Sequence, residues 1–161
     1  MIGIIGAMHE EIIELKSEMM NIKETNVANM TFFEGKLKNR DVVLVESGIG
    51  KVNSAVCTTL LIERFAIDRL IFTGVAGGVN ANLNVGDIVI SKDLIQHDVD
   101  ATAFGAKYGE IPRMDIVNFK ADSGLVNIAE DVAINLFKDK NIISGRILSG
   151  DQFISSMEKI E

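Results

Sequence analysis

Short apolar runs that end in glycine-containing turns recur along the chain, and they restrict the possible folds more than any other feature. Four such turns follow runs typical of buried strands, at 6–8, 47–50, 73–78 and 149–151. Helical patterns alternate with these runs, which predicts an α/β domain with a mixed central sheet flanked by helices. Such sheets bind ligands beyond the carboxyl ends of their strands, where glycine permits close approach to the backbone. We therefore expect the four turns to share one pocket.

The spacing of apolar residues predicts the individual elements. Helices are expected over 8–20, 51–66 and 122–137. Buried strands are expected over 1–6 and 68–74, further strands over 86–91 and 142–150, and a β-hairpin over 29–48. The helix over 51–66 is apolar on most sides, so we expect it to be covered on two faces. The remaining stretch, 103–120, reads as a long loop of the kind that is often functional.

Composition narrows the partners and the location. The net charge of −7 opposes binding to nucleic acid or to an anionic membrane, because both require clustered basic side chains. The chain lacks an apolar run long enough to span a membrane. Cys57 is the single cysteine, so an internal disulfide is impossible and a cytoplasmic location is expected. Without repeats or linkers, residues 1–161 are expected to form one domain.

Two adjacent glutamates, Glu10 and Glu11, fall in the first turn of the first predicted helix. On a helical wheel, Met8, Ile12 and Leu15 form the apolar stripe. Glu10 lies opposite this stripe and should face water, where a carboxylate interacts favourably with the helix dipole. Glu11 lies at the edge of the stripe, near the strand ends. The pattern leaves two roles open for Glu11, a capping group or a catalytic carboxylate.

Other motifs give little support for a cofactor or a metal. The segment SGIGK, residues 47–51, lacks the first glycine and the hydroxyl residue of a phosphate-binding loop, and GIIGAM does not match the dinucleotide fingerprint. The two histidines, His9 and His97, have no converging ligand cluster, so no metal is expected. His97 and Asp98 are expected to make a structural hydrogen bond at a strand end.

Six segments together resemble a known family. They are IGIIGAMHEE, ESGIGKVNSA, FTGVAGGVNANLNVGDIVIS, HDVDATAFG, FKAD and LSGDQFI, in order between residues 2 and 154. The combination is similar to the bacterial 5′-methylthioadenosine/S-adenosylhomocysteine nucleosidases of the purine nucleoside phosphorylase-like superfamily. This resemblance implies a nucleoside phosphorylase-like three-layer fold, a homodimer, no cofactor, and hydrolysis of the N-glycosidic bond to release adenine and a thioribose.

The resemblance also implies roles for individual residues. Glu11 matches the residue that holds the nucleophilic water below the ribose ring. The remaining positions that match the substrate pocket are Met8, Ile49, Val75, Ala76, Gly77, Phe153 and Ile154. Within this set, adenine would stack on Phe153 and pair with the backbone of Ile154. A neighbouring subunit would cover the 5′-alkylthio group with Ala101, Phe104 and Pro112.

The resemblance covers about the first two-thirds of a family member. The family's purine-protonating aspartate and ribose-holding Met-Glu segment have no counterpart here, so we expect a domain incomplete at its C-terminus and a chain that is inefficient alone. Two alternatives to the nucleosidase stay open. One is a phosphate-dependent purine nucleoside phosphorylase, which would require a basic residue on the phosphate. The other is a non-catalytic fragment that binds nucleosides.

Overall fold

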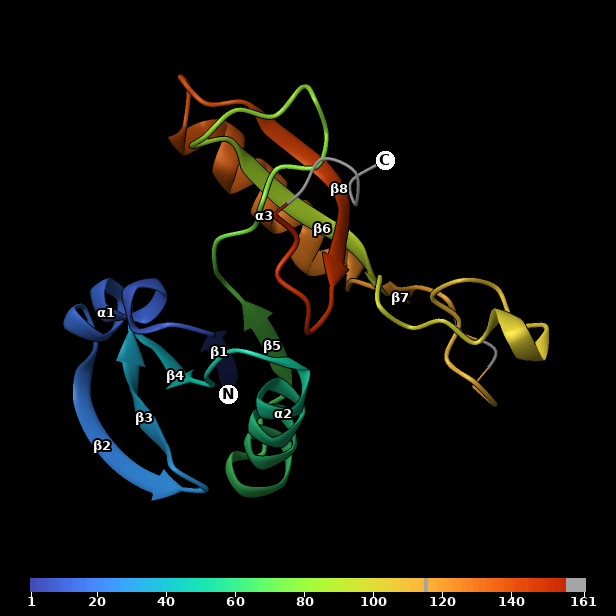
Figure 1. Cartoon of the computed structure of the whole chain (residues 1–161). Helices are drawn as coiled ribbons and strands as arrows, with labels where there is room; N and C mark the ends of the chain where they lie inside the picture. Colours follow the sequence, from blue (N-terminus) through green and yellow to red (C-terminus); the bar gives the residue numbers. More distant parts are fainter. Residues whose placement is uncertain (115, 156–161) are drawn as a thin grey trace. The chain divides into compact units, whose positions relative to one another are not determined.

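The computed structural model describes residues 1–114 and 116–155 (Figure 1). It divides into two compact units, Met1–Ala76 and the chain from Gly77 onward. Each unit is described by itself below.

The first unit is built on a mixed sheet of five strands. Its elements are β1 (Ile2–Gly6), α1 (His9–Ser17), β2 (Met20–Val27), β3 (Met30–Leu37), β4 (Arg40–Glu46), α2 (Lys51–Phe65) and β5 (Arg69–Phe72). The strand order is β2-β3-β4-β1-β5, in which β1 runs parallel to both of its neighbours and β2-β3-β4 is an antiparallel meander. The carboxyl ends of β4, β1 and β5 therefore meet at one edge of the sheet.

Helices α1 and α2 cover opposite faces of this sheet. Alternate residues of the strands point to opposite faces, so Ile4 packs with Ile12 of α1 while Ile5 packs with Cys57 and Leu61 of α2. The cluster under α2 also contains a stacked pair of rings, Phe32 and Phe65, whose centroids lie 4.8 Å apart. The first unit is thus a three-layer α/β/α arrangement, as the alternation of elements predicts.

The second unit contains a smaller, three-stranded sheet. Its elements are β6 (Ile88–Gln96), η1 (Thr102–Phe104), β7 (Phe119–Lys120), α3 (Ser123–Leu136) and β8 (Ile142–Ser149). The order is β7-β6-β8, with β6 parallel to β8 and antiparallel to β7. Asp122 caps the N-terminus of helix α3, because its side chain accepts a hydrogen bond from the Leu125 N–H at 2.9 Å.

The α/β class, the hairpin over 29–48 and the three helices are confirmed, and four details differ from expectation. Strand β2 was not predicted, because its MNIKETNV sequence is polar and mostly exposed. The first helix ends at Ser17 rather than near residue 20. Strand β5 is exposed rather than buried, since among the described residues it pairs with β1 alone and forms the edge of its sheet. Helix α2 buries only Cys57 and Leu61, so one of its faces is covered rather than two.

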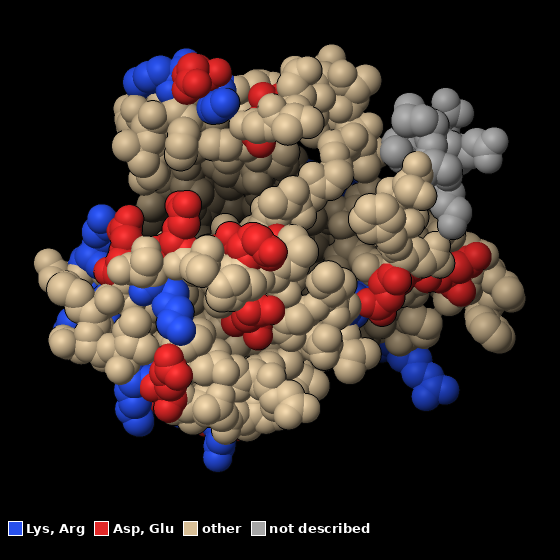
Figure 2. Space-filling view, turned by 60° about the vertical axis from the view of Figure 1, so that its left-hand side comes forward, with Lys and Arg blue, Asp and Glu red and all other residues tan. Residues whose placement is uncertain are grey.

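Two further observations concern the surface. Acidic and basic side chains are interspersed over the face shown in Figure 2, with a formal net charge of −7 for the whole chain. Among the helices of residues 1–114 and 116–155, none combines the length and the apolar character that a membrane crossing requires.

The expectation that residues 1–161 form a single domain remains a prediction.

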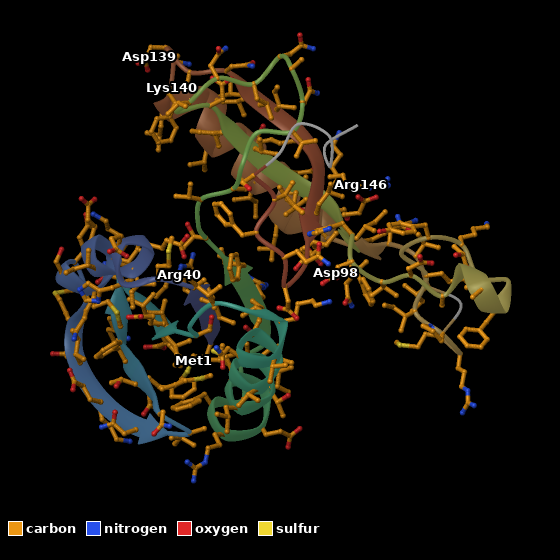
Figure 3. All side chains as sticks on the ribbon, in the orientation of Figure 1. Met1, Arg40, Asp98, Asp139, Lys140 and Arg146 are labelled. Carbon is orange, nitrogen blue, oxygen red and sulfur yellow. The ribbon has the colours of Figure 1, made fainter. Side chains whose placement is uncertain are left out.

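The carboxylate of Asp93, on the central strand of the second sheet, makes the stability of the second unit depend on pH. Arg146 on β8 (Figure 3) donates from Nε and Nη2 to the two carboxylate oxygens of Asp93 on β6, at 2.6 and 2.8 Å. Asn118 donates to the same carboxylate at 2.9 Å. These donors, Arg146 foremost, lower the pKa of Asp93 to about 2. Because the unfolded chain binds this proton more tightly, the interaction stabilises the fold above about pH 4 and is lost as pH falls through about 2.

We therefore expect Asp93→Asn to lower the melting temperature at pH 7. The difference from the parent protein should shrink as pH falls from 4 to 2, where the parent carboxylate takes up its proton. Thermal unfolding followed by circular dichroism across this range measures it. Asp139→Asn is the matched control, because this exposed carboxylate in the turn before β8 (Figure 3) makes a single long ion pair among the described residues, with Lys140 at 3.9 Å. An equal melting temperature for Asp93→Asn and the parent at pH 7 would contradict the expectation.

Candidate active site

The first turn of α1 directs Glu11 back toward the end of β1. Glu11 lies three residues beyond Met8, which precedes the helix, and its own N–H donates to the Met8 carbonyl at 3.1 Å. Its carboxylate oxygen Oε2 accepts hydrogen bonds from the N–H groups of Ala7, at 2.7 Å, and Met8, at 3.1 Å. Glu11 is half-buried while Glu10 is exposed, as the helical wheel predicts. Glu11 therefore does cap the helix.

A third donor comes from the turn that follows β5. The Val75 N–H donates to the other carboxylate oxygen of Glu11, Oε1, at 2.9 Å. Gly74 makes this approach possible, because a Cβ atom at position 74 would lie only 2.6 Å from Oε1. The carboxylate thus joins the turns after β1 and β5, two of the four turns expected to share a pocket.

Capping does not exhaust what this carboxylate can bind. A carboxylate offers about four acceptor positions, two on each oxygen. In Glu11, Oε2 uses both of its positions on Ala7 and Met8, whereas Oε1 uses one on Val75. The N-terminal end of α1 adds positive potential around the group. Among the residues that the structure describes, Oε1 is therefore a fixed acceptor with one position left for a water molecule or a ligand hydroxyl.

The structure brings part of the predicted pocket together in the first unit. Met8 and Val75 are tied to Glu11 by the hydrogen bonds described above. Ile49 is exposed in the turn between β4 and α2, where its carbonyl accepts a hydrogen bond from Asn53 at 2.7 Å. Ala76 is exposed next to Val75.

The other predicted residues belong to the second unit and are placed there. In this unit Ala101 is buried, Gly77 and Pro112 are exposed, Phe104 ends the short helix η1 with its ring exposed, Phe153 is exposed, and Ile154 is half-buried. No contact assigns a role to these residues, so their functions remain predictions.

A hydrogen bond fixes the turn that leads to Phe153. The carboxylate of Asp98, just beyond β6, accepts from the Asp151 N–H at 2.9 Å. The neighbouring residue His97 contacts Gly150 so closely that a Cβ atom at position 150 would overlap its imidazole ring. The expected structural hydrogen bond for the His97-Asp98 pair is confirmed, with Asp98 as the acceptor. The sequence did not reveal that Asp151 is the donor, since nothing in the local pattern links residue 98 to residue 151.

The residues that the structure describes contain no cluster of three or more histidine, cysteine, aspartate or glutamate side chains suited to a metal ion. The thiol of Cys57 lies in the core, where burial raises its pKa to about 11.

Comparison with known proteins agrees with this geometry. The family model described as "Phosphorylase superfamily" matches residues 1–161. A curated relative from Staphylococcus haemolyticus, a 5′-methylthioadenosine/S-adenosylhomocysteine nucleosidase, is 50% identical over 159 residues, covering 99% of this chain and 68% of the relative. A nucleosidase of the same name from a Geobacillus species is 48% identical over 160 residues, with the same coverage of 99% and 68%.

Solved structures give the same result. The Neisseria meningitidis nucleosidase in complex with methylthio-immucillin-A superimposes with a TM-score of 0.94 at 41% identity, covering 99% of this chain and 68% of the other. A mutant of the Helicobacter pylori nucleosidase, with 5′-methylthioadenosine in its active site, gives a TM-score of 0.92 at 34% identity with the same coverage. The expected nucleoside phosphorylase-like fold is thus confirmed. The chain belongs to the 5′-methylthioadenosine/S-adenosylhomocysteine nucleosidase family of the phosphorylase superfamily.

Proposed function

We propose that the chain hydrolyses the N-glycosidic bond of 5′-methylthioadenosine and S-adenosylhomocysteine. Water oxygen bonds to the anomeric carbon as the bond from this carbon to the adenine nitrogen breaks. The products are adenine, which gains one proton of the water, and the thioribose, which keeps the hydroxyl. Because positive charge develops on the ribose in such cleavages, a carboxylate below the ring both stabilises the transition state and orients the water.

The carboxylate of Glu11 is the observation that carries this proposal. Three backbone N–H groups hold it in one orientation at the carboxyl ends of β1 and β5. A general base is effective only when its geometry is set before the reaction begins. The remaining acceptor position on Oε1 is the place for the attacking water.

The other roles rest on the family resemblance. Met8 and Ile49 would line the pocket, and Val75, Ala76 and Gly77 would lie along the sugar and the base. Phe153 would stack on adenine, and the Ile154 backbone would pair with its edge. Adenine stacking on an exposed aromatic ring is favourable because both are flat apolar surfaces.

We further propose that the protein works as a cytoplasmic homodimer. Ala101, Phe104 and Pro112 of one subunit would cover the 5′-alkylthio group bound to the other. The ring of Phe104 is 93% exposed within the chain, which suits an apolar side chain that a partner or substrate covers.

Release of adenine from 5′-methylthioadenosine in phosphate-free buffer tests the proposed function. We expect turnover that is unchanged when inorganic phosphate is added, with the free thioribose as the second product. Liquid chromatography of the reaction mixture measures both products. A requirement for phosphate, with a sugar phosphate as product, would identify a phosphorylase instead. Binding of the nucleoside without any turnover would indicate the non-catalytic alternative.

A further inference from the structure

The segment HDVD, residues 97–100, follows β6 and is part of the family resemblance, but the proposed function gives it no role. Its two carboxylates accept hydrogen bonds over very different distances along the chain. Asp100 is exposed and accepts from the N–H and the hydroxyl of Thr102, at 3.0 and 2.7 Å, so it serves its own turn. Asp98 is half-buried and accepts from the N–H of Asp151, which lies 53 residues further along the chain. Asp98 therefore links two segments that are distant in the sequence.

This link lies where the pairing of β6 with β8 ends. The two strands run parallel and pair as far as Gln96 and Ser149. One backbone hydrogen bond follows, from the His97 N–H to the Ser149 carbonyl at 2.9 Å. The Asp98 carboxylate then adds the 2.9 Å contact to the Asp151 N–H. A side chain thus continues the connection between the two segments beyond the end of β8, and Figure 3 shows Asp98 beside this end of the strand.

Gly150 lies between these two linked positions and packs against the His97 ring. A Cβ atom at position 150 would overlap that ring. The backbone of Gly150 does not have a positive φ, so the space beside the ring, and not the backbone conformation, requires glycine here. The turn 149–151 is therefore fixed at each of its three residues, by a backbone hydrogen bond, by packing and by the Asp98 carboxylate.

The turn leads to Phe153, two residues beyond Asp151. The Phe153 ring is 93% exposed, so its neighbours in the described structure contribute little to its position. Two residues of chain span at most about 7 Å, so the hydrogen bond at Asp151 limits where the ring can lie. A group whose position is set before binding loses less conformational freedom when the ligand arrives, and this strengthens binding.

We propose that Asp98 is a positioning residue for the adenine base. By accepting from the Asp151 N–H, it holds the turn 149–151 in the conformation that presents the Phe153 ring for stacking and the Ile154 backbone for pairing. This inference rests on the proposed function, in which these two residues bind adenine. Asp98 acts through the backbone of the turn, and not through a contact of its own with the substrate.

Steady-state kinetics with 5′-methylthioadenosine test this positioning role. For Asp98→Ala we expect KM to rise about tenfold and kcat to change less than about threefold, because contacts with adenine are lost from the bound substrate and the transition state alike. Partial loss of the fold would instead lower kcat and leave KM unchanged, since only folded protein turns over. Asp98→Asn keeps an oxygen that can accept from the Asp151 N–H, so its KM should stay within about threefold of the parent. Asp139→Ala, which removes an exposed carboxylate from the turn before β8, is the matched control.

Fluorescence measures the stacking itself, because the chain contains no tryptophan. Phe153→Trp places a single indole at the proposed stacking position, and adenine that stacks on it should quench its emission. Titration with free adenine then gives a dissociation constant without any turnover. We expect the addition of Asp98→Ala to weaken adenine binding about tenfold, and the addition of Asp139→Ala to leave it within about twofold.

The outcomes separate the two proposals. An unchanged KM or an unchanged adenine affinity in Asp98→Ala would overturn the positioning role and leave the nucleosidase proposal intact. Asp98→Asn as impaired as Asp98→Ala would also overturn it, because the hydrogen bond to the turn would then not be the contact that matters. Adenine that leaves the emission of Phe153→Trp unchanged would remove the stacking on which the role rests. A parent protein that releases no adenine from 5′-methylthioadenosine would overturn the proposed function, and the positioning role with it.

Discussion

Glu11→Gln should lower the rate of adenine release by about 10²- to 10⁴-fold, the range by which a positioned general base accelerates a reaction. The amide has the size of the carboxylate but cannot take a proton from water. It also disturbs the anchoring of the side chain. One end of the amide can accept from Ala7 and Met8, but its NH₂ group then faces the Val75 N–H, which needs an acceptor.

Steady-state assays with 5′-methylthioadenosine measure the effect, and Glu10→Gln is the control. Glu10 is the adjacent carboxylate on the same helix turn, and it is exposed. Its replacement should leave turnover within about twofold, since surface substitutions away from a site have small effects. Turnover by Glu11→Gln within about threefold of the parent would show that another group activates the water.

The location of Glu11 could be read from the sequence because helical periodicity fixes the angle of each side chain around the axis. Ile12 is 1% exposed, so the apolar stripe is real, and Glu11 beside it is half-buried. The same periodicity misplaced the end of the helix. Met19 fits the stripe and is 7% exposed, but it reaches the core from the residue before β2 rather than from the helix.

Strand β2 is an element of the fold that the local sequence pattern did not predict. Its side chains are mostly exposed, so the sequence does not alternate between apolar and polar residues. Its pairing with β3 is specified instead by the turn at Ala28 and Asn29, both of which have positive φ, 50° and 61°. By contrast, the apolar strand β4 was found easily, because Val42, Val43, Leu44 and Val45 are all buried between the helices.

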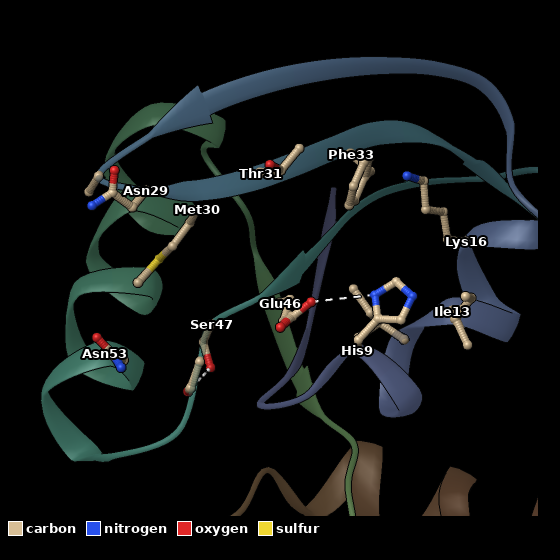
Figure 4. A pocket seen from close by; sticks show the side chains of 13 residues that line it. His9, Ile13, Lys16, Asn29, Met30, Thr31, Phe33, Glu46, Ser47 and Asn53 are labelled. Carbon is tan, nitrogen blue, oxygen red and sulfur yellow. Dashed lines mark hydrogen bonds and ion pairs between the residues drawn. The ribbon is translucent and has the colours of Figure 1, made fainter.

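In the site, periodicity could not reveal contacts between distant segments. Val75 lies 64 residues from Glu11, and its contribution is a backbone N–H that any residue except proline carries. The resemblance placed Val75 in the pocket without showing this contact. The ion pair of His9 and Glu46, whose Nδ1 and Oε2 atoms lie 3.6 Å apart (Figure 4), was missed for a similar reason, since His9 begins α1 and Glu46 ends β4. Only the pairing of β1 with β4 places them together.

Gly74→Ala should reduce turnover by about 10²-fold, the loss expected when a catalytic group is displaced by about 1 Å. The new Cβ atom would lie 2.6 Å from Oε1 of Glu11 and 2.9 Å from its Cδ, so the carboxylate must move. The backbone at Gly74 does not have the positive φ that favours glycine. Moving the carboxylate weakens the hydrogen bonds by which Glu11 caps α1, so we expect the free energy of unfolding to fall by about 1 kcal/mol, the usual loss when a helix cap is removed. Gly145→Ala is the control, because its Cβ atom would make only an ordinary contact, 3.8 Å from Val89.

The decisive measurement for Gly74 combines it with Glu11. If Gly74→Ala acts only by displacing the carboxylate, it should have no further effect on the residual turnover once Glu11→Gln has removed the base. The double variant should then match Glu11→Gln alone, although each single variant is strongly impaired. Losses that instead multiply in the double variant would mean that Gly74 serves the reaction independently, for example by letting substrate approach the turn after β5. Such a result would mean that position 74 must be glycine to leave room for the substrate, and not to leave room for the Glu11 carboxylate.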